Sequence, residues 1–130
     1  MMSIDAELWR AYQQPYFRFE ALPKANQFAI ITAWNPSSVW CSLVDNDRNN
    51  QCLAADLVHT GYSCVLVGDQ NFTWAEESFA APISLEQAVV LGQKYAQNAI
   101  YFIDGEQLFL LSCQDETPPL LLGEWRHRCR

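Results

Sequence analysis

The chain has 130 residues, of which half are apolar and 13% are aromatic, and its formal net charge is −7. This composition predicts one folded domain with a substantial core and excludes a largely disordered chain. The negative charge argues against binding of nucleic acid, which requires a cationic surface. No apolar run approaches the roughly 20 residues of a membrane span, and the first residues lack the basic head and apolar core of an export signal. We therefore expect a cytoplasmic protein with neither a nucleic-acid nor a membrane partner.

A helix and a short strand are predicted at the start of the chain. Large side chains recur three or four residues apart at Leu8, Trp9 and Tyr12, which predicts a helix over residues 5–14. Residues 16–21 alternate in character, which favours a short strand at a sheet edge.

The main strand is predicted over residues 28–34, a run of apolar and β-branched residues. Such a run is typical of a strand that is buried on both faces. Pro36 keeps the residue before it out of the right-handed helical region. We therefore expect Asn35 to be extended, with its amide held at the end of this strand.

The rest of the chain predicts two helices, two strands and a hairpin. In chain order these elements cover residues 46–60 (helix), 63–68 and 74–81 (strands), 84–96 (helix), and 99–103 with 106–112 (hairpin). Ser84 and Gln87 form a capping-box pattern at the start of the last helix, and Asp104-Gly105 is typical of a tight hairpin turn. Residues 114–130 are expected to form a C-terminal tail.

From residue 28 onward, the order strand, helix, strand, strand, helix, strand predicts an α+β domain of the ferredoxin-like (split βαβ) type. We expect an antiparallel-rich sheet with two helices on one face, and with strand 28–34 between strand 74–81 and the hairpin. An extra N-terminal helix and strand and a C-terminal hairpin strand complete the predicted plait. The alternative is another α+β layering in which the N-terminal strand enters the sheet centre. Residues 1–130 are expected to form a single domain with its core at about 14–113.

The five cysteines show neither a Cys-x-x-Cys pair nor the spacing of zinc ligands. Their positions are Cys41, Cys52, Cys64, Cys113 and Cys129. Because their number is odd and a cytoplasm is reducing, a disulfide framework is not expected. The sequence therefore predicts reduced, structural thiols, with no metal site and no cofactor.

Four short motifs occur in the order and spacing of a known family. They are Thr32-Ala-Trp-Asn-Pro36, Asn46 with Asn50 and Leu53, Glu76-Glu-Ser-Phe79, and Gln97-Asn-Ala-Ile100. Together they resemble the bacterial domain-of-unknown-function family 3293 over about residues 14–105. Members often carry an arginine three residues after the helix-capping asparagine, where this chain has Asn49. The family has no established activity, so the resemblance implies no particular reaction.

Polar residues from four segments are expected to meet at one edge of the predicted sheet, because a strand and the helix that follows it meet there. The candidate ligand-binding residues at this edge are Asn35, Asn46, Glu76, Glu77, Ser78, Gln97 and Asn98. The start of the helix at Asn46 adds free N–H groups and the positive end of its dipole. Two interpretations are open: a site for a small polar ligand, and a network in which the amides tie loops together by hydrogen bonds.

The adjacent Glu76 and Glu77 are not expected to act as a catalytic dyad, since a strand sends successive side chains to opposite faces. Glu77 shares its face with Phe79. If Phe79 points into the helix-covered core, Glu77 is the carboxylate that we expect to be buried, with a raised pKa suited to acid–base catalysis. Glu77 is therefore the candidate catalytic residue, with a structural hydrogen-bond acceptor as its alternative role.

The preferred functional prediction is a module that binds a small polar ligand or a protein partner at this edge. One alternative is a small enzyme that uses Glu77 as general acid or base, with Asn35 and Gln97 orienting the substrate. Another is a protein–protein interaction module without a ligand. No glycine-rich phosphate loop or nucleophile elbow favours the enzyme. Binding of RNA by Tyr101 and Phe109 is disfavoured by the acidic charge and by the missing basic–aromatic motif.

The first testable prediction concerns the thiols. Protein prepared without reductant should show five free thiols by mass spectrometry, because the spacing favours neither a disulfide nor a zinc site. A stoichiometric zinc ion or a native disulfide would contradict this prediction.

Overall fold

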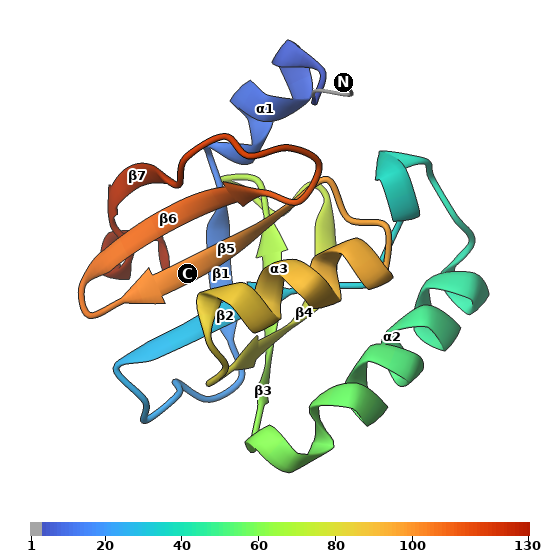
Figure 1. Ribbon diagram of the computed structural model, residues 1–130, viewed down its shortest axis with the longest axis horizontal. Helices are drawn as coiled ribbons and strands as arrows, with labels where there is room; N and C mark the ends of the chain where they lie inside the picture. Colours follow the sequence, from blue (N-terminus) through green and yellow to red (C-terminus); the bar gives the residue numbers. More distant parts are fainter. Residues whose placement is uncertain (1–3) are drawn as a thin grey trace.

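The computed structural model describes residues 4–130, in which three α-helices accompany a seven-stranded sheet (Figure 1). The helices are α1 (Ala6–Tyr12), α2 (Leu43–Leu57) and α3 (Leu85–Lys94). The strands are β1 (Tyr16–Phe19), β2 (Gln27–Ile31), β3 (Ser63–Gly68), β4 (Ala75–Ala81), β5 (Ala99–Asp104), β6 (Gln107–Ser112) and β7 (Leu120–Glu124). Short 3-10 turns lie at Pro36–Ser38 (η1), Val58–Thr60 (η2) and Arg126–Arg128 (η3). No helix among these residues is long and apolar enough to cross a membrane.

Neighbouring strands are antiparallel throughout the sheet, and their order is β1-β3-β4-β2-β5-β6-β7. β2 lies between β4 and β5, as predicted for the main strand. β1 lies at the sheet edge, so the alternative that put the N-terminal strand at the sheet centre is wrong.

The predicted ferredoxin-like plait with two helices is also wrong. The seven strands curl into a half-barrel, with α2 and α3 on its convex face and α1 as a third helix at one end (Figure 1). The reason lies in β2, which is apolar on both faces: Ala29 and Ile31 face the helices, and Phe28 and Ile30 face the concave side. A sheet covered by helices on one face alone would leave the second apolar face in water. Curling of the sheet buries it.

Two clusters of buried side chains make the core. The convex cluster packs α2 and α3 against the same face of the sheet, through side chains such as Leu53, Leu57 and Phe79. The concave cluster receives side chains from all seven strands and from the C-terminal segment: Phe17, Phe19, Phe28, Ile30, Val65, Val67, Ala80, Tyr101, Ile103, Leu108, Leu122 and Trp125. The interior of the half-barrel is therefore a packed core of its own.

The C-terminal segment, predicted as a tail, contributes β7 and η3 and closes the half-barrel. After η3 the chain reaches the opposite edge strand, β1. There Arg130 N donates to the Phe17 carbonyl at 2.8 Å, and Phe17 and Cys129 form an isolated parallel bridge. The C-terminal segment thus joins the two edges of the sheet. It covers part of β1, which would otherwise be an unpaired edge strand.

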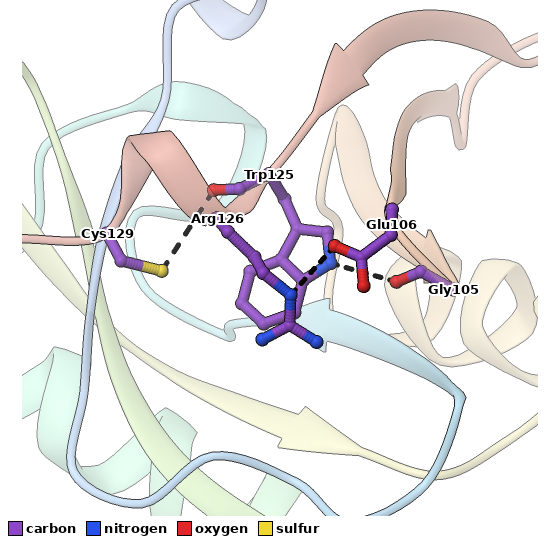
Figure 2. Close-up of polar contacts among 5 residues, drawn as sticks. All are labelled: Gly105, Glu106, Trp125, Arg126 and Cys129. Atoms are coloured by element: carbon purple, nitrogen blue, oxygen red, sulfur yellow. Dashed lines mark hydrogen bonds and ion pairs between the residues drawn. The ribbon is translucent and has the colours of Figure 1, made fainter.

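Trp125 lies in this C-terminal segment, and its side chain is buried in the concave cluster. It is only 3% exposed and packs edge-on against Phe28. Figure 2 shows its Nε1 donating to the Gly105 carbonyl at 2.9 Å, and beside it the ion pair of Arg126 with Glu106 at 2.7 Å. The ion pair lies at the surface, where both side chains are 58% exposed.

The second prediction compares these two neighbours. Trp125→Ala should lower the free energy of unfolding by about 3–5 kcal/mol, because it empties the concave cluster of its largest side chain. Arg126→Ala is the control and should cost clearly less than Trp125→Ala, since both its exposed ion pair with Glu106 and its contact over the Trp125 ring are weak. Urea denaturation of both variants measures the difference. Equal losses in the two variants would show that Trp125 does not hold the half-barrel closed.

Candidate functional site

The loop between β2 and α2 has an unusual backbone. Three of its residues have left-handed conformations although none is glycine: Asn35 (φ 47°), Ser37 (φ 57°) and Ser38 (φ 60°). The predicted extended conformation of Asn35 is therefore wrong. Pro36 disfavours the right-handed helical region for the residue before it, and asparagine adopts the left-handed region more readily than most residues. Such conformations are uncommon and cluster at functional sites.

Two asparagines hold this loop through reciprocal hydrogen bonds. Asn35 N donates to Asn46 Oδ1 at 2.9 Å, and Asn46 Nδ2 donates to Asn35 Oδ1 at 3.1 Å. α2 begins at Leu43, with Ser42 as its N-cap, and not at Asn46 as predicted. Asn46 therefore lies inside the helix and is 4% exposed, so it is a buried partner of the loop rather than a capping residue.

Asn50 and Gln97 bond to the backbone just before this turn. Asn50 Oδ1 accepts from Ala33 N at 2.8 Å, and Gln97 Nε2 donates to Trp34 O at 3.0 Å. Because β2 has already ended, these side-chain amides take the place of neighbouring strands for this stretch of backbone. The amide network consists of Asn35, Asn46, Asn50 and Gln97.

The structure brings several of the predicted site residues together. Asn35, Asn46 and Gln97 belong to the amide network, and Asn98 follows it directly in the chain. Glu76 joins through Oε2, which accepts from Asn35 Nδ2 at 2.8 Å. The acidic side chain that meets the amides is therefore that of Glu76, the residue before the candidate that the sequence favoured.

The two glutamates face opposite sides of β4. Glu76, opposite Val67, and the buried Ser78 face the concave side. Glu77 is exposed on the convex side, where it lines an open groove of about 550 Å³ between α2 and the strands β1 and β3. The expected burial of Glu77 is wrong, because α2 covers the sheet around Phe79 but stands away from it at this groove.

The contact of Glu77 with the amide network is made by its backbone. Its carbonyl accepts from Asn50 Nδ2 at 2.8 Å. Its carboxylate lines the convex groove, whereas Asn35 and Gln97 line a cavity on the other side of the sheet. The three residues that the enzyme hypothesis combined therefore do not face one common cavity.

Two adjoining cavities lie where α1 meets the end of the half-barrel, with volumes of about 80 Å³ and about 350 Å³. Both are lined by Tyr12, Asn35, Ser38, Trp74, Glu76 and Tyr101. Trp34 and Gln97 line the small cavity, and Trp40 lines the large one. We call the two cavities together the rim site.

Sequence reasoning missed the aromatic wall of the rim site. Tyr12 belongs to a predicted helix face and Trp74 to the start of a predicted strand, and neither pattern indicates a ligand. Long-range contacts join this wall: Tyr101 OH donates to the Tyr12 carbonyl at 2.6 Å, and the hydroxyls of Tyr12 and Ser38 are hydrogen-bonded at 2.6 Å. Asn98 Nδ2 also donates to Ser38 Oγ, at 3.0 Å. These contacts join residues far apart in the chain, so no local sequence pattern predicts them.

Glu76 provides the negative charge of the rim site. None of the described residues that line the two cavities is a lysine or an arginine. Burial raises the pKa of the Glu76 carboxyl above its ordinary value, and the hydrogen bond from Asn35 opposes this effect without cancelling it. Within residues 4–130, only Oε2 of this carboxyl has a hydrogen-bond partner. The other oxygen is therefore available to a ligand.

The described part of the chain has no cluster of side chains that could bind a metal ion. Among residues 4–130, no group of three or more His, Cys, Asp or Glu side chains could hold a metal ion. The five cysteines are unpaired and occupy separate places: Cys52 and Cys64 are exposed, Cys113 is buried, and Cys41 and Cys129 are intermediate. The state of the thiols in solution stays a prediction.

The family model described as "Protein of unknown function (DUF3293)" matches residues 31–100, more than half of the 130 residues. The chain belongs to this family. The matched part of this DUF3293 protein contains the amide network and Glu76, whereas Tyr12 and Tyr101 of the rim site lie outside it. No curated protein and no solved structure matched the chain. The comparisons therefore show the family of the chain and no activity.

The third prediction tests the amide network of this DUF3293 protein. Asn46→Ala should lower the free energy of unfolding by about 1–3 kcal/mol, because it leaves the Asn35 N–H without its acceptor. Asp47→Ala, at the next and exposed position of α2, is the control and should change stability little. Denaturant unfolding of the two variants gives the comparison. If Asn46→Ala is as stable as the control, the network does not hold the loop.

Proposed function

We propose that the protein binds a small polar ligand at the rim site, with Glu76 as the anchoring group. The observation that carries this proposal is the partly buried carboxyl group of Glu76, which lines both cavities and has one oxygen without a protein partner. A buried titratable group with a perturbed pKa in a cleft is a frequent feature of binding and catalytic sites.

A second polar group without a partner supports the same proposal. Trp34 lines the small cavity, and its buried Nε1 has no hydrogen-bond acceptor within residues 4–130. The rim site thus combines an acceptor on Glu76 with a donor on Trp34. Its large cavity, about 350 Å³, falls within the roughly 300–1,000 Å³ that small-ligand sites occupy.

The strained loop supports a binding role as well. Left-handed conformations at three non-glycine residues cost free energy, and the amide network holds them in place. Asn35 links this network to the site, since it bonds to Asn46 with one end of its amide and to Glu76 with the other. The Glu76 carboxyl is thereby held in one orientation before a ligand arrives, which favours affinity.

A protein partner is the second candidate. Val39, Trp40, Leu43 and Val44 form an exposed apolar run beside the rim site, with exposed fractions of 65%, 81%, 62% and 66%. Contiguous exposed apolar residues are typical of interaction surfaces. A ligand-independent complex that is lost in Trp40→Ala and kept in Glu76→Gln would favour this candidate.

The fourth prediction tests ligand binding by thermal shift. A panel of anionic, neutral polar and amine metabolites should contain at least one compound that raises the melting temperature of the wild type. A ligand at 100 times its Kd stabilises the folded state by about 2.7 kcal/mol. We expect the shift to disappear in Glu76→Gln, which keeps the side-chain size and an acceptor for Asn35.

Glu77→Gln is the matched control, because it makes the same change one residue away on the opposite face of β4. It should keep the full ligand-induced shift. The proposal fails if no compound shifts the wild type, or if the shift is the same in Glu76→Gln as in the wild type.

A further inference from the structure

We infer that the rim site selects organic cations, such as amines and quaternary ammonium ions. The inference rests on the proposed ligand-binding function and specifies the ligand class. It follows from one partly buried carboxyl group that shares two cavities with aromatic rings over which no cation of the described chain stands.

The first step is charge balance. Glu76 is the acidic residue that lines the two cavities, and no lysine or arginine of the described chain lines them with it. Its hydrogen-bond donor within residues 4–130 is the neutral amide of Asn35. Even partial burial of a carboxylate is costly without a positive partner. A cationic ligand supplies the charge that the protein does not.

The second step is the chemistry of the walls. Tyr12, Trp40, Trp74 and Tyr101 line the large cavity. The face of such a ring attracts a cation, and one contact strengthens binding by about 2- to 30-fold. Trp40 and Trp74 remain 81% and 53% exposed, so their rings are accessible to a ligand.

The third step is a contrast within the molecule. Elsewhere the protein places its own cations over aromatic rings: Arg18 over Phe72, Lys94 over Tyr95, Arg126 over Trp125 and Arg130 over Tyr16. No cation of the described chain stands over a ring that lines the rim site. The rings that line the rim site with Glu76 are therefore the ones over which the described chain places no cation.

Other ligand classes fit this site less well. An anion would meet the Glu76 carboxylate and find no cationic side chain among the described lining residues. A neutral sugar could stack on the rings and donate hydrogen bonds, but its binding would not require a charge on Glu76. Glu76→Gln separates these classes, since it removes the charge and keeps the shape and the acceptor.

The inference also implies a direction for the pH dependence. A cation binds the ionised form of Glu76, and burial raises the pKa of this carboxyl. Affinity should therefore be full above the raised pKa and fall as the pH drops through it. The residues that share the cavities with Glu76 are Tyr12 from α1, Asn35, Ser38 and Trp74 from loops, and Tyr101 from β5. Arg128 of η3 does not itself line either cavity, but it donates to the carbonyl of Pro15, which lines the large cavity, and to that of Leu122, and its charge acts on Tyr101.

The fifth prediction uses two matched pairs of probes on the full chain. Choline is compared with 3,3-dimethyl-1-butanol, which has the same shape without the charge, and benzylamine is compared with benzyl alcohol. Binding is measured by calorimetry and by tryptophan fluorescence. The cation of at least one pair should bind about 10- to 100-fold more tightly than its neutral match: benzylamine through a hydrogen bond between charged groups, and choline, which has no N–H, through charge attraction to the carboxylate and the rings.

Three variants locate the effect. Glu76→Gln should remove the preference for the cation and the pH dependence, whereas Glu77→Gln should keep both. Trp74→Ala should weaken binding of the cation by about 2- to 30-fold and leave folding intact, because its ring is half exposed. These readouts respond to the charge and the ring, and not only to the stability of the fold.

The outcomes distinguish this inference from the proposed function. If a neutral or anionic compound binds at the rim site while neither cation is preferred, the ligand class is wrong and the proposed function stands. If no probe and no panel compound binds, or if binding depends on Glu77 and not on Glu76, both are wrong.

Discussion

The structure depends on one constraint, which is that the central strand β2 is apolar on both faces. Helices α2 and α3 bury Ala29 and Ile31, and the curl of the sheet buries Phe28 and Ile30. Because burial of apolar area is the main favourable term in folding, the second face drives the closure of the half-barrel. Its two edges then meet where the chain returns from η3 to β1. The closure also leaves an open end beside α1, and the rim site lies there.

At this end of the half-barrel, side-chain amides form the hydrogen bonds to the backbone that neighbouring strands form elsewhere. β2 stops at Ile31, and the backbone that follows is bonded to Asn50, Gln97 and Asn46. This arrangement lets the loop adopt left-handed conformations that a continued strand would forbid. Asn35 has two roles in it, since it stabilises the loop and also holds the Glu76 carboxyl. Stability and the proposed binding are therefore coupled through one side chain.

A single residue step along β4 separates two environments. Glu76 is partly buried in a cavity with aromatic walls, whereas Glu77 lies in an open groove beside α2. The alternation of side chains in a strand guarantees that the two carboxylates face different surroundings. It does not say which of them is buried, because burial depends on what covers each face. Here the concave face is closed by the curl of the sheet, and the convex face is open at the groove.

The sequence by itself determined the positions of most helices and strands, the neighbours of β2, the Asp104-Gly105 hairpin and the family. It also indicated that Asn35, Asn46 and Gln97 would meet. These features follow from periodicity, turn chemistry and the order of elements, which are local properties of the chain. The tertiary structure alone decided the curl of the sheet, the left-handed Asn35, the place of the C-terminal segment and the partial burial of Glu76. Each of these depends on contacts between distant segments, such as Trp125 against Phe28 and Tyr101 against Tyr12. A local sequence pattern cannot predict such contacts, because they form, and stabilise the protein, only when the whole chain is packed.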